Sequence, residues 1–258
     1  MARQRMGQHF LGSLSWRKRI LESLPRAVDE TWVEIGAGHG EMTQLLAEEG
    51  RRVIAVEADP QLAARLKDDA AGWGKVEIVE GDVLGLDLRK IAGGDFRVYG
   101  NLPYYITSPI LHQLFAYTDR LVSIHIVIQL EVAERIVAAP GRREYGYLSA
   151  VCQYYARPEI VFRIPPGAFR PPPRVNSALV RMMVPGESAA LNIGNEKLFI
   201  EFIATCFGQK RKTLRNNLRG IAKDEKIHAA LAGCGLRNDA RAEQLTLAQF
   251  ASLFGQLA

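Results

Sequence analysis

Cysteine is scarce in this chain of 258 residues. Cys152, Cys206 and Cys234 lie far apart in the sequence and form no Cys-x-x-Cys pair. The sequence therefore supports neither a disulfide framework nor a zinc site, and we expect buried or incidental thiols and no bound metal.

Long apolar runs are absent as well. The longest, 121–130, is interrupted by Ser123, His125 and Gln129 and is too short to span a bilayer. Basic residues near the N-terminus are not followed by a continuous apolar stretch, so no signal peptide is visible. These absences predict a cytoplasmic protein. No heptad or other self-association pattern is present, and we expect a monomer.

Acidic residues are missing from three segments that carry much of the positive charge. Segments 1–21, 163–186 and 207–219 hold 5, 4 and 5 basic residues and no acid, while the whole chain has a net charge of +5. A run of like charge is usually a solvated face. Three such segments on one surface would instead favour a polyanion such as nucleic acid.

Short β-rich runs alternate with helical patterns from Thr31 onward. This alternation predicts an open, mostly parallel α/β sheet. Two further runs have no obvious helix between them and would suit an antiparallel edge of that sheet. The strands are expected at 32–35, 52–57, 76–80, 96–99 and 122–130, the helices over 41–48 and from Pro60, Ser108 and Glu131, and the two edge runs at 159–164 and 176–184.

The pattern changes after the linker-like segment 185–188, because nothing beyond it is typical of a strand. Apolar residues instead recur at helical spacing, which predicts a small helical domain. The residues that carry this pattern are Ile200, Ile203, Ala204 and Phe207, continued by Leu214 and Leu218, then Gly233 and Gly235 at the end of a later helix, and Leu247, Phe250 and Phe254 in the last one.

Candidate ligand-binding residues follow the first three strands. Gly36, Gly38 and Gly40 allow a tight turn and close approach of a ligand to the next helix, although their spacing makes a dinucleotide pyrophosphate the less suitable ligand. Glu57 is placed to accept hydrogen bonds from ribose hydroxyls; its alternative is an exposed strand-end carboxylate. Asp82 can accept a hydrogen bond from an adenine amino group, or simply form a turn.

The segment Asn101-Leu102-Pro103-Tyr104 follows the fourth strand. The Asn101 amide oxygen and a nearby backbone carbonyl can accept hydrogen bonds from the exocyclic amine of a planar base, and the Tyr104 ring offers a stacking face. This is the apparatus that methylation of adenine N6 requires, whereas the bland alternative is a proline turn. Because all four sites lie at the carboxyl ends of successive strands, where open α/β sheets bind ligands, chance agreement is a poor explanation.

Taken together, these motifs resemble the rRNA adenine N6,N6-dimethyltransferases, and most closely the KsgA branch, which acts on small-subunit rRNA. The resemblance covers nearly the whole chain and its motifs are specific in combination. It is carried by segments 7–11 (GQHFL), 34–38 (EIGAG), 101–104 (NLPY), 169–175 (FRPPPRV) and 210–218 (KRKTLRNNL), with Glu57 and Asp82.

The resemblance implies a Rossmann-like methyltransferase domain over 1–185 and a helical RNA-binding domain over 190–258, with S-adenosyl-L-methionine as cofactor and no metal. It implies dimethylation of two adjacent adenines near the 3′ end of 16S rRNA in the assembling 30S subunit. The implied cofactor contacts are His9, Leu11, Gly36, Gly38, Glu57, Asp82 and Asn101; the implied catalytic residues are Asn101, Leu102, Pro103 and Tyr104; and the implied substrate or RNA contacts are Tyr104, Phe169, Lys210, Arg211, Lys212 and Arg215.

Two rival functions stay open at this point. An antibiotic-resistance methylase acting on large-subunit rRNA would share the motifs of the first domain, although segment 210–218 favours the small-subunit branch. An assembly factor that mainly binds and checks the immature subunit is a rival of another class, and the intact Asn-Leu-Pro-Tyr motif argues against a chain that has lost catalysis. A small-molecule methylase would have no use for three basic segments.

Overall fold

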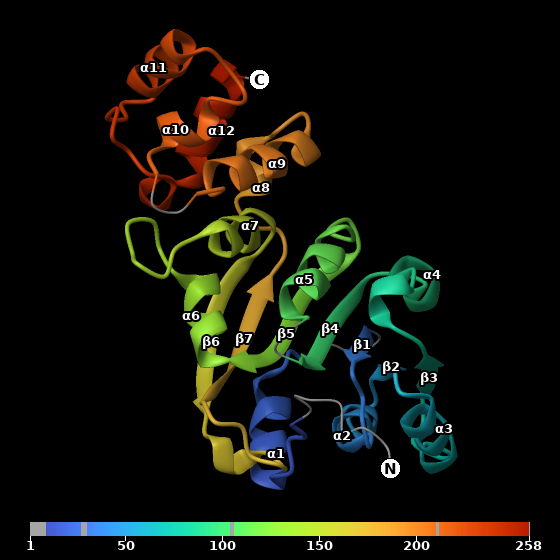
Figure 1. The fold of residues 1–258 in the computed structure, drawn as a ribbon. Coiled ribbons are helices and arrows are strands. Elements are labelled where there is room, and N and C mark those ends of the chain that lie inside the picture. Colours follow the sequence, from blue (N-terminus) through green and yellow to red (C-terminus); the bar gives the residue numbers. More distant parts are fainter. Residues whose placement is uncertain (1–8, 27–29, 104–105, 210–211, 258) are drawn as a thin grey trace. The chain divides into compact units, whose positions relative to one another are not determined.

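The computed structural model describes residues 9–26, 30–103, 106–209 and 212–257 (Figure 1). It consists of two compact units. Unit 1 is Met1–Ala133 with Pro158–Val184, and unit 2 is Glu134–Arg157 with Pro185–Ala258. The segment 134–157 thus groups with the helical part of the chain, although it precedes residue 185, because its side chains share the helical core described below.

Unit 1 is built on a seven-stranded sheet with the order β3-β2-β1-β4-β5-β7-β6. β1 pairs in parallel with β2 and β4, β2 with β3, and β4 with β5, whereas β7 is antiparallel to β5. The mostly parallel sheet with an antiparallel edge is therefore confirmed. The strands are β1 (Thr31–Ile35), β2 (Arg52–Glu57), β3 (Val76–Glu80), β4 (Phe96–Asn101), β5 (Leu121–Gln129), β6 (Arg157–Ile164) and β7 (Ser177–Met183).

Burial explains why the central strands are so apolar. Every residue of β1 is buried, as expected for a parallel strand with helices over both faces, whereas the edge strand β3 has exposed acids at Glu77 and Glu80. The strand order reverses between β1 and β4, and open α/β sheets bind their ligands at the carboxyl ends of the strands at such a reversal.

The helices of unit 1 mostly begin where the sequence predicts. Asp59 caps α3 by accepting the N–H groups of Gln61 (2.9 Å) and Leu62 (3.3 Å), with Pro60 at the first helical position. The N-terminal helix α1 was not predicted. The elements are α1 (Leu14–Ser23), α2 (Glu41–Glu48), α3 (Pro60–Asp69), the 3₁₀ turns η1 (Val83–Gly85) and η2 (Pro166–Ala168), α4 (Leu88–Ala92), α5 (Thr107–Phe115) and α6 (Leu130–Val137), which crosses the boundary between the units.

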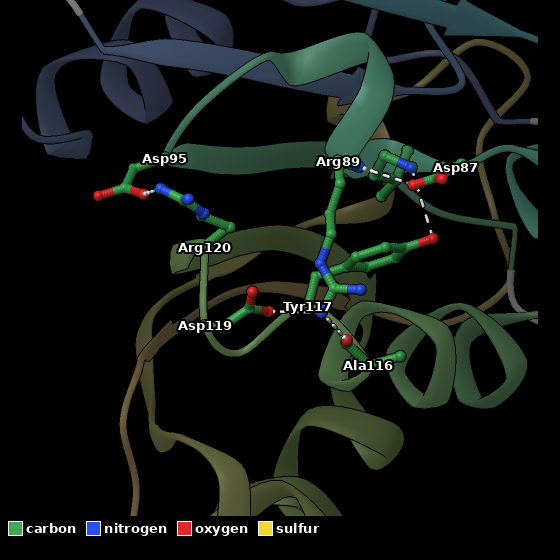
Figure 2. A network of polar contacts seen from close by, with 8 residues as sticks. Asp87, Arg89, Asp95, Ala116, Tyr117, Asp119 and Arg120 are labelled. Carbon is green, nitrogen blue, oxygen red and sulfur yellow. Dashed lines mark hydrogen bonds and ion pairs between the residues drawn. The ribbon is translucent and has the colours of Figure 1, made fainter.

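A polar network lies beside the amino-terminal ends of strands β4 and β5 (Figure 2). The Arg89 guanidinium of α4 donates to Asp119 Oδ1 (2.7 Å) and lies over the Tyr117 ring, 5.3 Å from its centroid. Asp95 accepts from Arg120 at 3.2 Å. The hydrogen bond from Arg89 lowers the pKa of the Asp119 carboxyl. These contacts hold α4 against the chain that enters β4 and β5.

Unit 2 contains only helices among its described residues after Val184, as predicted. These helices are α8 (Ser188–Leu191), α9 (Glu196–Cys206), α10 (Leu214–Leu218), α11 (Asp224–Gly233), the 3₁₀ turn η3 (Ala242–Gln244) and α12 (Leu247–Leu257); the earlier segment of the unit adds α7 (Tyr147–Tyr155). Their core includes Tyr145 and Tyr154 from the 134–157 segment and Phe199, Phe202 and Phe250 from the later helices.

The apolar stripe predicted from Ile200 to Leu218 is only partly right. Ile203, Leu214 and Leu218 are fully buried, but Ala204 is exposed. The stripe is also divided between two helices, because α9 ends at Cys206 and α10 begins only after Thr213, whose hydroxyl accepts the Asn216 N–H at 3.4 Å. The periodicity of apolar residues in the sequence does not show where one helix ends and the next begins.

All three cysteines are free; Cys152 and Cys206 are buried, and burial raises the pKa of both thiols. Within the described ranges, no set of three or more His, Cys, Asp and Glu side chains is arranged to hold a metal ion. None of the described helices has the length and apolar character needed to cross a membrane.

Candidate active site

The glycine turn after β1 has an open side. Gly36, Gly38 and Gly40 all have positive φ (74°, 59° and 80°), which L side chains rarely adopt. A Cβ at Gly40 would lie 2.3 Å from Leu66, and one at Gly38 would lie 2.9 Å from the Phe10 ring. At Gly36, in contrast, nothing lies within 4 Å of an added Cβ. A ligand can therefore approach the backbone at Gly36.

Glu57 at the end of β2 supports this turn. It is buried, its Oε2 accepts the Gly38 N–H at 2.8 Å, and its Oε1 accepts the Asp59 N–H at 2.9 Å. The alternative of an exposed strand-end carboxylate is thus wrong. Each carboxylate oxygen keeps a further lone pair, so Glu57 can shape the turn and still accept a hydroxyl.

Asp82 follows β3, the neighbour of β2, and is exposed. Its Oδ1 accepts the Leu84 N–H at 3.0 Å, so turn formation accounts for one oxygen. Gln113 of α5 holds the same turn by donating to the carbonyls of Val83 (2.7 Å) and Leu86 (3.1 Å). The second oxygen of Asp82 remains available to a ligand, and sequence reasoning missed Gln113 because α5 is distant in the chain.

The Asn101 side chain has a fixed orientation. Its Nδ2 donates to the backbone carbonyl of His9 at 2.8 Å. Because a carbonyl can only accept, the amide nitrogen must face His9, and Oδ1 is left as an acceptor on the other side. The sequence predicts the amide but not the partner that orients it.

Two backbone carbonyls after Asn101 differ in availability. The Pro103 carbonyl already accepts the Ile106 N–H (3.2 Å) and the Thr107 hydroxyl (3.3 Å) at the start of α5. Leu102 is buried and anchored by its N–H to Val127 at 3.1 Å, and its carbonyl accepts from no other described residue. The Leu102 carbonyl is therefore the second acceptor beside Asn101. Tyr104 lies outside the described residues.

The N-terminal arm, residues 9–13, connects Asn101 to two other segments. Phe10 pairs with Arg170 through two backbone hydrogen bonds of 3.0 and 2.8 Å, and Ser13 N–H donates to Ala168 at 3.1 Å. His9 Nδ1 lies 2.8 Å from the Pro171 carbonyl, so this nitrogen carries the proton. The Phe10 ring packs 4.6 Å from the His39 ring at the glycine turn.

The described contacts of Leu11 and Phe169 are with the core. Leu11 is 6% exposed and Phe169 is 1% exposed, and both belong to the core cluster that contains Trp32 and Tyr99. The Phe169 ring is thus covered in this structure, and its stacking on a substrate base stays a prediction. Its burial anchors the segment that pairs with the N-terminal arm.

Glu34 lies beneath the glycine turn, a position that sequence reasoning quoted without giving it a role. It is 3% exposed, and its Oε2 accepts the Thr43 hydroxyl of α2 at 2.6 Å. Burial raises the pKa of this carboxyl to about 8. In the sequence, Glu34 could have been noticed as the one acid within the predicted strand. In the structure it pairs with Tyr99 on β4.

The basic segment near α10 differs from the prediction in one respect. Lys212 is exposed, but Arg215 donates from Nε to Asp224 Oδ1 at 2.8 Å, and its terminal nitrogen pairs with the other oxygen. Arg219 is 3.9 Å from the same carboxylate, and the hydrogen bond from Arg215 lowers the pKa of Asp224. The premise that no acid pairs with this segment is wrong, since the acid follows it on α11. Lys210 and Arg211 lie outside the described residues.

The arrangement suits a nucleoside ligand and a base beside it. The open backbone at Gly36, the carboxylate lone pairs of Glu57 and the second oxygen of Asp82 provide acceptors and space at the ends of β1, β2 and β3. Asn101 ends the neighbouring strand β4 with a free amide oxygen. S-adenosylmethionine has the ribose hydroxyls and adenine amine that such acceptors bind, so these residues fit it.

Comparison with known proteins gives a consistent result. The family model described as "Ribosomal RNA adenine dimethylase" matches residues 1–258. The curated "Ribosomal RNA small subunit methyltransferase A" of Koribacter versatilis is 41% identical and covers 98% of this chain and 93% of its own length. The protein of the same name from Xanthomonas campestris pv. campestris is 40% identical, with 98% and 95% coverage.

Two solved structures share the fold over almost the entire chain. A dimethyladenosine transferase from Plasmodium falciparum superposes with a TM-score of 0.81 at 22% identity, covering 95% of this chain and 96% of that one. The 23S rRNA methyltransferase ErmE has a TM-score of 0.74 at 25% identity, with 96% and 99% coverage. The Rossmann-like methyltransferase fold is therefore confirmed.

Proposed function

The chain belongs to the ribosomal RNA adenine dimethylase family, and from this membership we propose that it dimethylates N6 of two adjacent adenines near the 3′ end of 16S rRNA. It is an S-adenosylmethionine-dependent methyltransferase. The observation that carries the chemistry is the Asn101 amide, whose nitrogen is held by the His9 carbonyl so that its oxygen is left to accept a hydrogen bond from a ligand.

The residues at the strand ends would each bind a different part of the cofactor. Glu57 would accept from the ribose hydroxyls, Asp82 from the adenine amine, and the open backbone at Gly36, with Gly38 shaping the same turn, would admit the remainder. When bound, S-adenosylmethionine supplies an electrophilic methyl group on a sulfonium. We propose that His9 and Leu11 also contact the cofactor from the N-terminal arm, where Leu11 packs in the core and the His9 carbonyl holds Asn101.

Asn101 and Leu102 would activate the target nitrogen. The lone pair of adenine N6 is delocalised into the ring, which makes it a poor nucleophile. Hydrogen bonds from the two amine hydrogens to Asn101 Oδ1 and the Leu102 carbonyl favour a pyramidal nitrogen, whose lone pair then points toward the methyl group. After transfer the nitrogen releases one proton to solvent, so the step needs no side chain that acts as a general base.

Residues other than Asn101 and Leu102 would also contact the substrate. Tyr104 follows Pro103 in the chain, and we propose that its ring stacks on the extruded base. Lys210, Arg211 and Lys212 would contact rRNA phosphates. Arg215 would contribute less, because Asp224 already occupies its guanidinium.

The substrate assignment to the small subunit follows the curated relatives. Proteins named for the small subunit are 40 and 41% identical to this chain, whereas the large-subunit enzyme ErmE is 25% identical. The substrate context that we propose is the pre-30S particle in the cytoplasm, with the protein acting as a monomer. Both the family and the site favour catalysis over a role limited to checking assembly.

The test is transfer of labelled methyl groups to undermethylated 30S subunits and, in parallel, to 50S precursors, followed by mapping of the modified bases. We expect dimethylation of adjacent adenines in 16S rRNA, and none in fully methylated 30S subunits, which serve as the control. Modification of 23S rRNA alone would assign the protein to the large subunit. Tight 30S binding without transfer would support the assembly role instead.

A further inference from the structure

Two of the acid-free basic segments meet in unit 1. The first, at the N-terminus, pairs with the second through the Phe10–Arg170 hydrogen bonds and through Ser13, so η2 lies beside the start of α1 (Figure 1). Gly12 touches the same partner, because an added Cβ there would lie 2.7 Å from Arg170 Cγ. Basic segments that lie far apart in the sequence thus lie side by side in unit 1.

The surface of these segments carries a stacked arginine. The Arg19 guanidinium lies 5.0 Å from the centroid of the Trp16 ring and 4.6 Å from that of Phe162 on β6. The two rings are themselves 5.9 Å apart. Both rings are partly exposed and Arg19 is exposed, so this group, called here the Trp16–Arg19–Phe162 cluster, borders solvent.

The positive charge of the cluster is not neutralised by its neighbours. Arg17 faces Glu41 at 3.7 Å, but Lys18 and Arg19 form no ion pair within the described part of the chain. Glu22, one turn later on α1, is exposed and forms none either. A guanidinium that lies over two rings has already lost much of its side-chain freedom, so its N–H donors can engage an anion at a reduced entropic cost.

The surface lies close to the proposed target site. His9, whose carbonyl holds Asn101, is seven residues before Trp16. Even a fully extended chain of that length spans only roughly 25 Å, and α1 shortens the path further. The start of α1 therefore lies within a few nucleotides' length of Asn101.

Resting on the function proposed above, we propose that the Trp16–Arg19–Phe162 cluster and Lys18 bind single-stranded rRNA next to the target adenines. Arg19 and Lys18 contact phosphates, and the exposed parts of the two rings contact a base. Phosphate recognition by a planar guanidinium and base stacking on aromatic rings are the two interactions that single-stranded nucleic acid offers. In unit 2, by contrast, the Arg215 guanidinium is already paired with Asp224.

The test compares two double charge reversals of equal net charge. K18E/R19E changes the proposed surface, and K90E/R120E changes exposed cations at the amino-terminal edge of the sheet, where Figure 2 shows Arg120. Methyl transfer to undermethylated 30S subunits is measured over a range of KCl concentrations. We expect K18E/R19E to raise KM for the subunits by about tenfold or more, since each lost charged hydrogen bond is worth about that factor.

Three further readouts make the result specific. The salt slope of log KM should fall by roughly 0.7 for each lost phosphate contact. The cofactor Kd and kcat should stay unchanged, and K90E/R120E should match the wild type. R19K keeps the positive charge but loses the planar guanidinium over the two rings. We therefore expect its KM for the 30S subunits to lie between those of the wild type and K18E/R19E. A KM equal to that of the wild type would refute the contact through the Arg19 guanidinium.

Binding to a fluorescein-labelled single-stranded RNA oligonucleotide separates this proposal from the function on which it rests. If the wild type binds the oligonucleotide and K18E/R19E does not, the surface stands even where 30S methylation fails. Equal KM and equal oligonucleotide affinity for K18E/R19E and wild type would overturn the surface while leaving the methyltransferase function intact. Loss of 30S affinity with unchanged oligonucleotide affinity would indicate a protein contact and also overturn it.

Discussion

Replacing Glu34 with Gln should remove a pH dependence of stability that the buried carboxyl creates. Glu34 is buried in β1 with the Thr43 hydroxyl on its Oε2. Burial, with repulsion from Glu41 and Glu57, raises its pKa from 4.5 to about 8. A glutamine mimics the neutral acid, because its amide oxygen can still accept from Thr43.

Glu34 loses its proton at a lower pH in the unfolded chain than in the folded protein. The unfolded chain ionises Glu34 near its ordinary pKa of 4.5, whereas the folded protein holds the proton until about pH 8. Between these values the unfolded state binds fewer protons, so the free energy of unfolding falls as pH rises. A shift from 4.5 to about 8, at about 1.4 kcal/mol per unit, gives a loss of about 5 kcal/mol across the window.

The assay is urea unfolding followed by tryptophan fluorescence, because Trp16, Trp32 and Trp73 all belong to unit 1. Unfolding is measured from about pH 5 to pH 8, the window set by the shifted pKa of Glu34. The extra amide hydrogen of E34Q costs about 1–3 kcal/mol if it finds no acceptor, so slopes against pH are compared rather than absolute values.

E34Q should lose most of the decline that the wild type shows as pH rises. E22Q, which removes an exposed carboxyl of α1, should follow the wild type. Parallel curves for wild type and E34Q would refute the reasoning, because they would mean that Glu34 titrates alike in both states.

Three further changes test the site and its surroundings. Asn101→Ala should lower kcat by about 10²- to 10³-fold, as for loss of one preorganised hydrogen-bonding group, and calorimetry should find a smaller change in cofactor Kd; near-normal turnover would contradict the assignment. Gly36→Ala and Gly50→Ala should introduce similar strain, about 1–2 kcal/mol each, because both glycines have positive φ and open space around an added Cβ. Only Gly36→Ala should weaken cofactor binding, and an equal loss of cofactor affinity in both variants would mean that Gly36 does not contact the ligand. Asp224→Asn should strengthen salt-dependent RNA binding by freeing Arg215, and a fluorescence titration that shows weaker binding would argue that the ion pair itself orders the RNA surface.

Local chemistry explains why much of the site could be predicted from sequence. Gly36, Glu57, Asp82 and Asn101 lie at or just after the carboxyl end of a β-rich strand, and parallel strands bring these ends to one edge. Asp59 before Pro60 is likewise a cap that can be recognised from two residues. Such features depend on neighbours only a few positions away.

The features that the sequence does not indicate have the opposite origin. Phe169 lies beside a basic, proline-rich segment, yet its ring is buried in a core formed by distant strands. Arg215 lies in a segment without acids, yet α11 brings Asp224 against it. Segment 134–157 precedes the linker but packs with the helices after it.

The sequence by itself thus determined the sheet, the glycine turn and the identity of the groups at the strand ends, because these follow from periodicity and turn chemistry within short windows. Only the tertiary structure decided which way the Asn101 amide faces, which carbonyl after it is available, and that Arg19 lies over both the Trp16 and the Phe162 rings. Those features depend on contacts between residues far apart in the chain, and a pattern along the sequence carries no record of which distant groups will meet.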